Sequence, residues 1–144
     1  MIYLNEQLPL PQGLRPLIRK HVAHIAQAYG LTKDVSITFC TRAFIQKLNW
    51  DYRNSNKATD VLSFEAKTAE TIGDIIIATP IARENAERYG NTLLAEILYL
   101  IIHGLCHLHD HDHGTAAEIA AMRTQENTLL AVINKANIHV SGRI

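Results

Sequence analysis

The segment from His103 to His113, HGLCHLHDHDH, holds five of the eight histidines of the chain. In an α-helix, His103 and His107 would lie one turn apart on the same face, so both imidazoles could reach one ion. A third ligand must approach from another direction to complete a tetrahedral site, and His113 can do so if the chain leaves the helix after His107. Three histidines leave the fourth position to water, which is the arrangement of a catalytic zinc.

The alternative is that these are solvated surface histidines, or core histidines with ordinary hydrogen bonds. A single histidine would favour that alternative. A third histidine six residues after a pair spaced by four, at the end of an apolar helix, favours a metal instead. We therefore predict one Zn²⁺ per chain, held by His103, His107 and His113, and we assign neither His109 nor His111 as a ligand.

The same spacing of three histidines occurs in the metzincin peptidases, which place a glutamate general base directly after the first histidine. This chain has Gly104 at that position. A peptidase without its base would be a poor catalyst, so the residues do not support proteolysis. A different hydrolytic reaction is expected.

The motifs resemble those of the YbeY endoribonucleases, whose signature is H-G-x-L-H-L-x-G-Y-D-H. The runs at 48–53 (LNWDYR), 59–64 (TDVLSF) and 73–75 (GDI) are similar to further motifs of that family, in the same order. The signature residues that fit are His103, Gly104, His107, Leu108, Asp112 and His113. Departures from the family pattern are Glu65, Cys106, Asp110 and His111, and none of them removes a ligand.

This resemblance implies a zinc-dependent endoribonuclease that prefers single-stranded RNA and acts in small-subunit ribosomal RNA maturation and ribosome quality control. Its partners would be ribosomal RNA, the small ribosomal subunit and ribosomal proteins. The implied fold is α+β and zincin-like, a single domain in which a small mixed sheet is flanked by helices. A buried central helix would carry the metal-binding histidines.

Cleavage of a phosphodiester builds negative charge on the phosphoryl oxygens, which a fixed cation can stabilise. Arg53 is the candidate because a guanidinium can bind two phosphate oxygens, and the resemblance places an essential arginine at this position. The alternative is that Arg53 is an ordinary solvated charge on a loop. Four basic residues against Asp51 between Arg42 and Lys57 also indicate a local docking patch for RNA, although they could equally solvate a helix. Asp112 could orient a ligand histidine or cap a turn.

Helix and strand patterns alternate in the elements that must position these residues. Short β-rich runs predict strands at 35–39, 61–64 and 74–78. Helices are predicted from Leu14 to Gly30, around 44–48, from Pro80 to Gly90 with Thr79 as N-cap, from Asn91 through the histidines, and from a capping box at Thr115 and Glu118. The tail beyond Ala136 is expected to be loose.

The 144 residues, 47% of them hydrophobic and 19% charged, suit one globular domain spanning 1–144. Basic and acidic residues number 14 each, so net charge gives no general attraction for nucleic acid or membranes. The apolar stretch 93–108 is shorter than the roughly 20 residues that cross a bilayer. The N-terminus lacks a secretory signal, so we expect a cytoplasmic protein, and the oligomeric state stays open.

Two cysteines, Cys40 and Cys106, are too few for a disulfide framework, and Cys106 is expected to pack as a small hydrophobic residue. Three classes of function therefore remain: a zinc ribonuclease, a zinc hydrolase of another bond such as a peptide, and a non-catalytic, metal-stabilised module that binds the ribosome. A fourth protein ligand on the metal would favour the third class.

Overall fold

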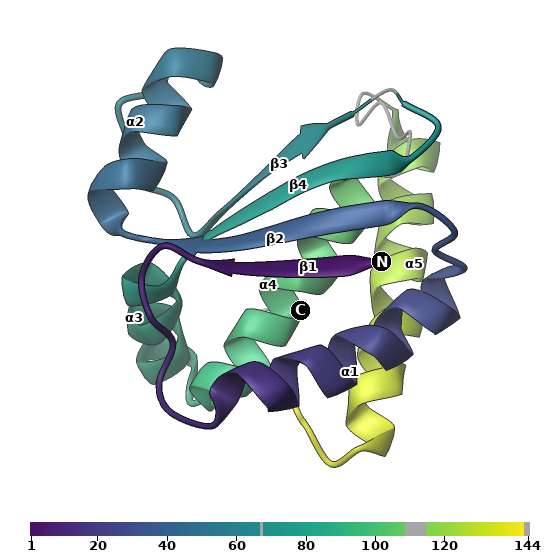
Figure 1. Ribbon diagram of the computed structural model, residues 1–144. Helices are drawn as coiled ribbons and strands as arrows, with labels where there is room; N and C mark the ends of the chain where they lie inside the picture. The colour runs from purple at the N-terminus through teal and green to yellow at the C-terminus, as the bar shows by residue number, and fades with distance from the viewer. Residues whose placement is uncertain (67, 109–114, 143–144) are drawn as a thin grey trace.

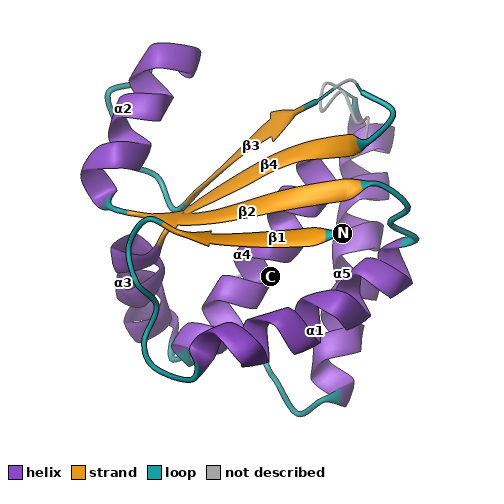
Figure 2. Ribbon diagram, in the orientation of Figure 1, coloured by secondary structure: helices purple, strands orange, loops and turns teal. Residues whose placement is uncertain are grey.

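The computed structural model describes residues 1–66, 68–108 and 115–142, which form a single α+β domain as expected. Its strands are β1 (Ile2–Glu6), β2 (Asp34–Cys40), β3 (Val61–Glu65) and β4 (Thr71–Ala78). Its helices are α1 (Leu14–Tyr29), α2 (Arg42–Arg53), α3 (Thr79–Tyr89), α4 (Leu93–Leu108) and α5 (Ala116–Lys135). Helices α1 and α4 pack against one face of the sheet, α5 packs against these two helices, and α2 stands over one end of the opposite face (Figures 1 and 2).

The sheet is mixed, with the strand order β1-β2-β4-β3. Strands β1, β2 and β4 run parallel, and β3 pairs antiparallel with β4 at the edge of the sheet. The sequence patterns did not predict β1. It is short and has only Leu4 fully buried, so its hydrophobic alternation is weak, and it exists because β2 offers it a parallel partner.

Helix α4 is the buried central helix that the sequence predicted. Twelve of its 16 residues are buried, and it contacts α1, α3, α5, β3 and β4. Among the described residues no single helix is long and apolar enough to span a membrane, although α3 and α4 together meet those criteria across a bend of 112°. Apolar packing accounts for the composition of α4, since its side chains lie in the main core against residues such as Ile37 and Ile75.

Both cysteines are buried and unpaired, as expected for packing residues. Burial raises the pKa of the Cys106 thiol to about 12, with a further contribution from the negative charge of Glu126, and raises the pKa of Cys40 to about 11. At neutral pH both are therefore protonated and poorly nucleophilic.

A second, smaller hydrophobic cluster lies under α2, on the open face of the sheet. It joins Ile45 of α2 to Leu62 and Ile76 of the sheet, with Leu48 and Phe64 packed at its margin. The helix begins where the hydroxyl of Thr41 accepts a hydrogen bond from the amide of Phe44. Because α2 covers only one end of this face, the side chains at its margin stay partly accessible.

Two local predictions were wrong, and one was confirmed. Thr79 does not cap α3: Ala78 occupies the N-cap position, and the Thr79 hydroxyl is buried without a partner inside the first turn. The Thr115 cap is confirmed, because its hydroxyl accepts from the amide of Glu118 at 3.1 Å. The tail is not loose, since Ser141 exchanges two hydrogen bonds with Asn91 while Ile138 and Val140 pack against the core.

Candidate active site

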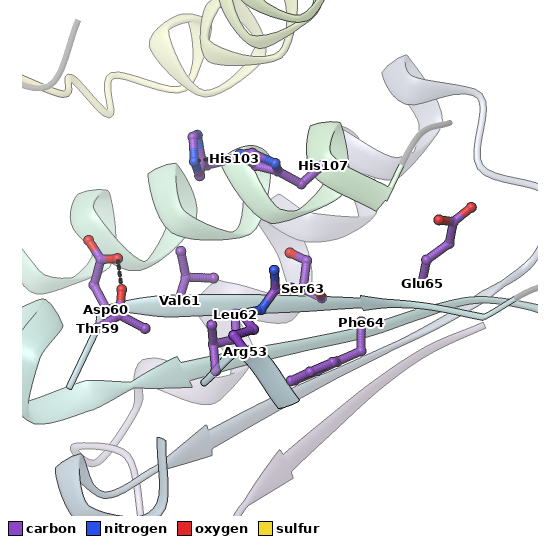
Figure 3. Close-up of a pocket in the computed structure, with 10 residues that line it drawn as sticks. All are labelled: Arg53, Thr59, Asp60, Val61, Leu62, Ser63, Phe64, Glu65, His103 and His107. Atoms are coloured by element: carbon purple, nitrogen blue, oxygen red, sulfur yellow. Dashed lines mark hydrogen bonds between the residues drawn. The ribbon is translucent and has the colours of Figure 1, made fainter. Parts of the chain in front are cut away.

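His103 and His107 lie on the same face of α4, and their Nε2 atoms are 2.9 Å apart. Both side chains line a cleft of about 560 Å³ between α4 and the edge strand β3 (Figure 3). Two imidazole nitrogens that converge on one point fit the donor set and the i, i+4 spacing of a zinc site. The third predicted ligand, His113, lies outside the described residues, as do 109–112. Within the described ranges no group of three potential ligands stands together.

Glu126 of α5 is a functional candidate that the sequence reasoning missed. Its carboxylate lies 2.6 Å from Nδ1 of His103, and its side chain is only 16% exposed. With the proton on Nδ1 donated to this carboxylate, the lone pair of Nε2 faces His107 and the cleft. A hydrogen bond of this kind commonly orients a histidine that binds a metal. Tyr99 also stacks on the His103 ring, with 6.0 Å between the ring centres.

A signal for Glu126 was present in the sequence. Met122, Leu129 and Ile133 form the buried stripe of α5, and Glu126 stands in that stripe where another apolar residue would be expected. A carboxylate on the buried face of a helix needs a partner. The sequence could not show that this partner is a histidine on α4. Asp112, considered as a residue that might orient a histidine, lies outside the described residues.

Arg53, the last residue of α2, reaches the same cleft from the opposite side. Its Nη2 donates a hydrogen bond of 2.7 Å to the carbonyl of Ser63, and its guanidinium carbon lies 5.5 Å from the centre of the Phe64 ring. The loop that follows α2 is fixed in turn, because the Asn49 amide donates to the carbonyl of Lys57. The fold thus brings Arg53 together with His103 and His107, as the chemistry of phosphodiester cleavage would require.

Strand β3 forms one wall of this cleft. The Ser63 hydroxyl donates to the carbonyl of Gly104 at 3.2 Å, which ties the edge strand to the histidine helix. Gly104 also allows α4 to approach the sheet, since a Cβ at this position would lie 2.9 Å from Cγ2 of Ile75. The glycine that replaces the peptidase glutamate therefore has a packing role of its own.

The predicted basic patch is only partly present. Arg42 forms an ion pair with Glu84, so its charge is balanced on the surface. Lys47 and Lys57 are exposed, and Arg53 is the member of the group that lines the cleft. Asp60 and Glu65 line the same cleft, so its charge is mixed rather than uniformly positive.

Comparison with known proteins decides the family. The sequence model of the family described as Endoribonuclease YbeY matches residues 4–134. The chain belongs to the YbeY endoribonuclease family. It is 36% identical over 142 residues to Endoribonuclease YbeY of Pelotomaculum thermopropionicum, covering 91% of this chain and 93% of the relative. It is 33% identical over 133 residues to the Carboxydothermus hydrogenoformans relative of the same name, covering 90% and 93%.

The fold is also shared with a solved structure. A solution structure of a protein from Thermotoga maritima superposes with a TM-score of 0.64 at 23% identity, covering 94% of this chain and 93% of that one. The runs at 48–53, 59–64 and 103–108, which resemble motifs of the family, all contribute residues to the cleft. These three runs are therefore adjacent in space although they are far apart in the chain.

The first prediction concerns the metal. Protein purified without a metal-affinity tag should contain one divalent ion per chain by elemental analysis. Alanine at His103, His107 or His113 should each lower occupancy strongly, because each change removes a ligand. Alanine at His24 or His139 serves as the control and should leave occupancy unchanged. Equal loss in both sets of variants would contradict the ligand assignment.

The second prediction concerns Glu126. Glu126→Ala should weaken zinc affinity by about 10- to 100-fold, the usual effect of removing a partner that orients a ligand histidine. Glu126→Gln should be intermediate, because its amide oxygen can still accept from Nδ1 without supplying charge. Competition with a chromophoric chelator would measure the affinities, and Glu87→Ala, an exposed carboxylate on α3, is the matched control. Unchanged affinity in Glu126→Ala would exclude the orienting role.

Proposed function

We propose that this chain is a zinc-dependent endoribonuclease that hydrolyses phosphodiester bonds in single-stranded RNA. In the cell it would act on ribosomal RNA of the small subunit, in maturation and in ribosome quality control, with ribosomal proteins as partners. Membership of the endoribonuclease family supports a hydrolase acting on RNA. The observation that carries the proposal is the shared cleft, which is lined both by Arg53 and by two converging imidazoles.

The residues present fit zinc. His103 and His107 supply two nitrogen donors whose Nε2 atoms converge, and Glu126 occupies the other nitrogen of His103. His113 would complete the set. When bound, zinc would supply Lewis acidity and activate water for attack near neutral pH. Gly104 supplies no side-chain base beside the metal, so activation of this water would rest on the metal itself.

Arg53 would bind the phosphoryl group of the substrate. One of its five N–H donors is held by the Ser63 carbonyl, which fixes the guanidinium at the edge of the cleft and leaves further donors for phosphate oxygens. A preorganised cation of this kind stabilises the negative charge that develops as the phosphodiester is cleaved. Asp60 and Glu65 in the same cleft would repel phosphates elsewhere along it, so the scissile phosphate is directed to Arg53.

Two other functions fit less well. An extended peptide substrate would pair with a free strand edge, but the Ser63 carbonyl on the edge of β3 already accepts from Arg53. A purely structural metal would need four protein ligands. Glu126 contacts Nδ1 of His103 and so lies on the far side of that ring from His107.

The third prediction tests the reaction class. Metal-loaded protein should cleave a defined single-stranded RNA faster than the same sequence held in a duplex. Chelator should abolish cleavage, and added zinc should restore it. His107→Ala should be inactive under all conditions. An unstructured peptide should stay intact; peptide hydrolysis that disappears in His107→Ala would instead assign a peptidase.

The fourth prediction concerns Arg53. Arg53→Glu should lower kcat/KM for RNA cleavage by on the order of 10²-fold or more, comparable with loss of one preorganised oxyanion donor. Arg53→Lys should be intermediate, because lysine keeps the charge but loses the planar fork. Zinc content should match the wild type in both variants.

Lys47→Glu is the control for Arg53→Glu, because it reverses the same charge on the same helix at an exposed position outside the cleft. It should cleave RNA within a few-fold of the wild type. Wild-type cleavage by metal-loaded Arg53→Glu would assign the phosphate-binding role to another residue.

A further inference from the structure

A second hollow lies on the open face of the sheet, on the other side of β3 from the histidines. It is a groove of about 370 Å³ between α2 and the strands. Phe44, Leu48 and Tyr52 follow one another at four-residue spacing along α2 and form one wall, and the strands contribute Phe64, Asp74 and Ile76. Its volume is within the range of roughly 300–1,000 Å³ that is typical of small-ligand sites.

This groove and the proposed active site share one lining residue, Phe64. The ring of Phe64 points away from the histidines, on the opposite side of β3 (Figure 3). The Arg53 guanidinium lies 5.5 Å from the ring centre, and Tyr52 meets the same ring edge-to-face at 5.4 Å. A group bound against Tyr52 would therefore be next to a phosphate bound by Arg53.

The exposed aromatic surface here is not explained by folding. Tyr52 is 70% exposed and Phe44 is 36% exposed, although both face the groove. Aromatic faces accessible to solvent are the usual means by which proteins hold the unstacked bases of single-stranded RNA. The flat side of a base suits an aromatic wall better than it suits the polar cleft on the other side of β3.

The charge of the groove favours a base over a phosphate. Asp74 is exposed and is the cross-strand partner of Phe64, so its carboxylate lies beside that ring on the floor of the groove. A carboxylate repels phosphate but accepts hydrogen bonds from the amino groups of bases. The phosphate of a bound nucleotide would therefore stay on the Arg53 side, with the base turned into the groove.

We propose that the groove between α2 and the open sheet face is a nucleobase subsite, in which Tyr52 stacks on the base adjacent to the scissile phosphate. This inference rests on the proposed function, because it assumes that RNA is the substrate and that Arg53 binds its phosphate. It adds a residue for substrate positioning, outside the metal centre.

The fifth prediction tests this subsite with a short single-stranded RNA whose cleavage position has been mapped. Tyr52→Ala should raise KM for this RNA by about 5- to 150-fold, the range expected for loss of one base–aromatic stack. Tyr52→Phe should stay near the wild type, because stacking requires the ring and not the hydroxyl. Trp50→Ala is the control: Trp50 is 55% exposed on the same helix but lines neither hollow.

An RNA with an abasic nucleotide beside the scissile phosphate tests the same subsite with the wild-type protein, so this experiment does not depend on how a variant folds. The abasic nucleotide should weaken binding to the wild type as much as Tyr52→Ala does with intact RNA, and the two changes together should cost no more than either alone. Zinc content and thermal unfolding of each variant would show that the metal centre and fold are unchanged.

Several results would overturn the subsite. These are wild-type KM in Tyr52→Ala, an abasic RNA that binds as well as the intact strand, or losses from the two changes that simply add. Loss of binding to a protein partner in Tyr52→Ala, with RNA cleavage intact, would assign the groove to protein docking. If the wild type cleaves RNA but is insensitive to these changes, only the subsite fails; if the metal-loaded wild type cleaves no RNA, the proposed function fails as well.

Discussion

Burial of α4 is the constraint on which the rest of the structure depends. Its apolar side chains, among them Ile97, Leu98 and Ile101, are fully removed from solvent, and each such side chain contributes about 1.5–3 kcal/mol to folding. The helix is thereby held between the sheet and the helices packed beneath it. His103 and His107 are partly buried members of this helix, so packing of the helix sets where they lie relative to the sheet, and Glu126 then orients the His103 ring.

The site also depends on the position of β3 at the edge of the sheet. A strand in the centre of the sheet would have neighbours on both sides, and its backbone carbonyls would be taken up by those strands instead of being open to Arg53. As an edge strand it presents a carbonyl to Arg53 and a hydroxyl to α4, both through Ser63. Its alternating side chains then serve two different surfaces: Ser63 and Glu65 line the histidine cleft, and Phe64 turns to the opposite face.

Charged side chains lie on several sides of the two histidines. Glu126 lies behind His103 on α5, Arg53 stands across the cleft, and Asp60 and Glu65 lie along it. A carboxylate behind an imidazole increases the electron density available at the opposite nitrogen, which favours a cation there. An arginine held by a carbonyl rather than by a carboxylate keeps its full charge for an anionic substrate. The cleft is thus suited to hold a metal cation at the histidines and a phosphate at Arg53.

The sequence by itself determined the features that depend on local pattern. Helical periodicity located α1, α4 and α5, the threonine at 115 fixed the start of α5, and histidine spacing placed two imidazoles on one face of α4. The motif resemblance identified the family. These inferences succeeded because 3.6-residue periodicity, capping and ligand spacing act over a few neighbouring residues.

Tertiary structure decided the features that depend on distant partners. Strand β1 has too weak a pattern to be recognised without β2, and Thr79 lies inside α3 because the helix starts directly after β4, with Ala78 at the N-cap position. The motif resemblance had predicted Arg53, but no spacing along the chain could reveal that Glu126 reaches His103 from α5 or that Arg53 is held by the Ser63 carbonyl. The physical reason is that a hydrogen bond between residues far apart in sequence is set by how helices and sheet pack, and packing is a property of the whole core.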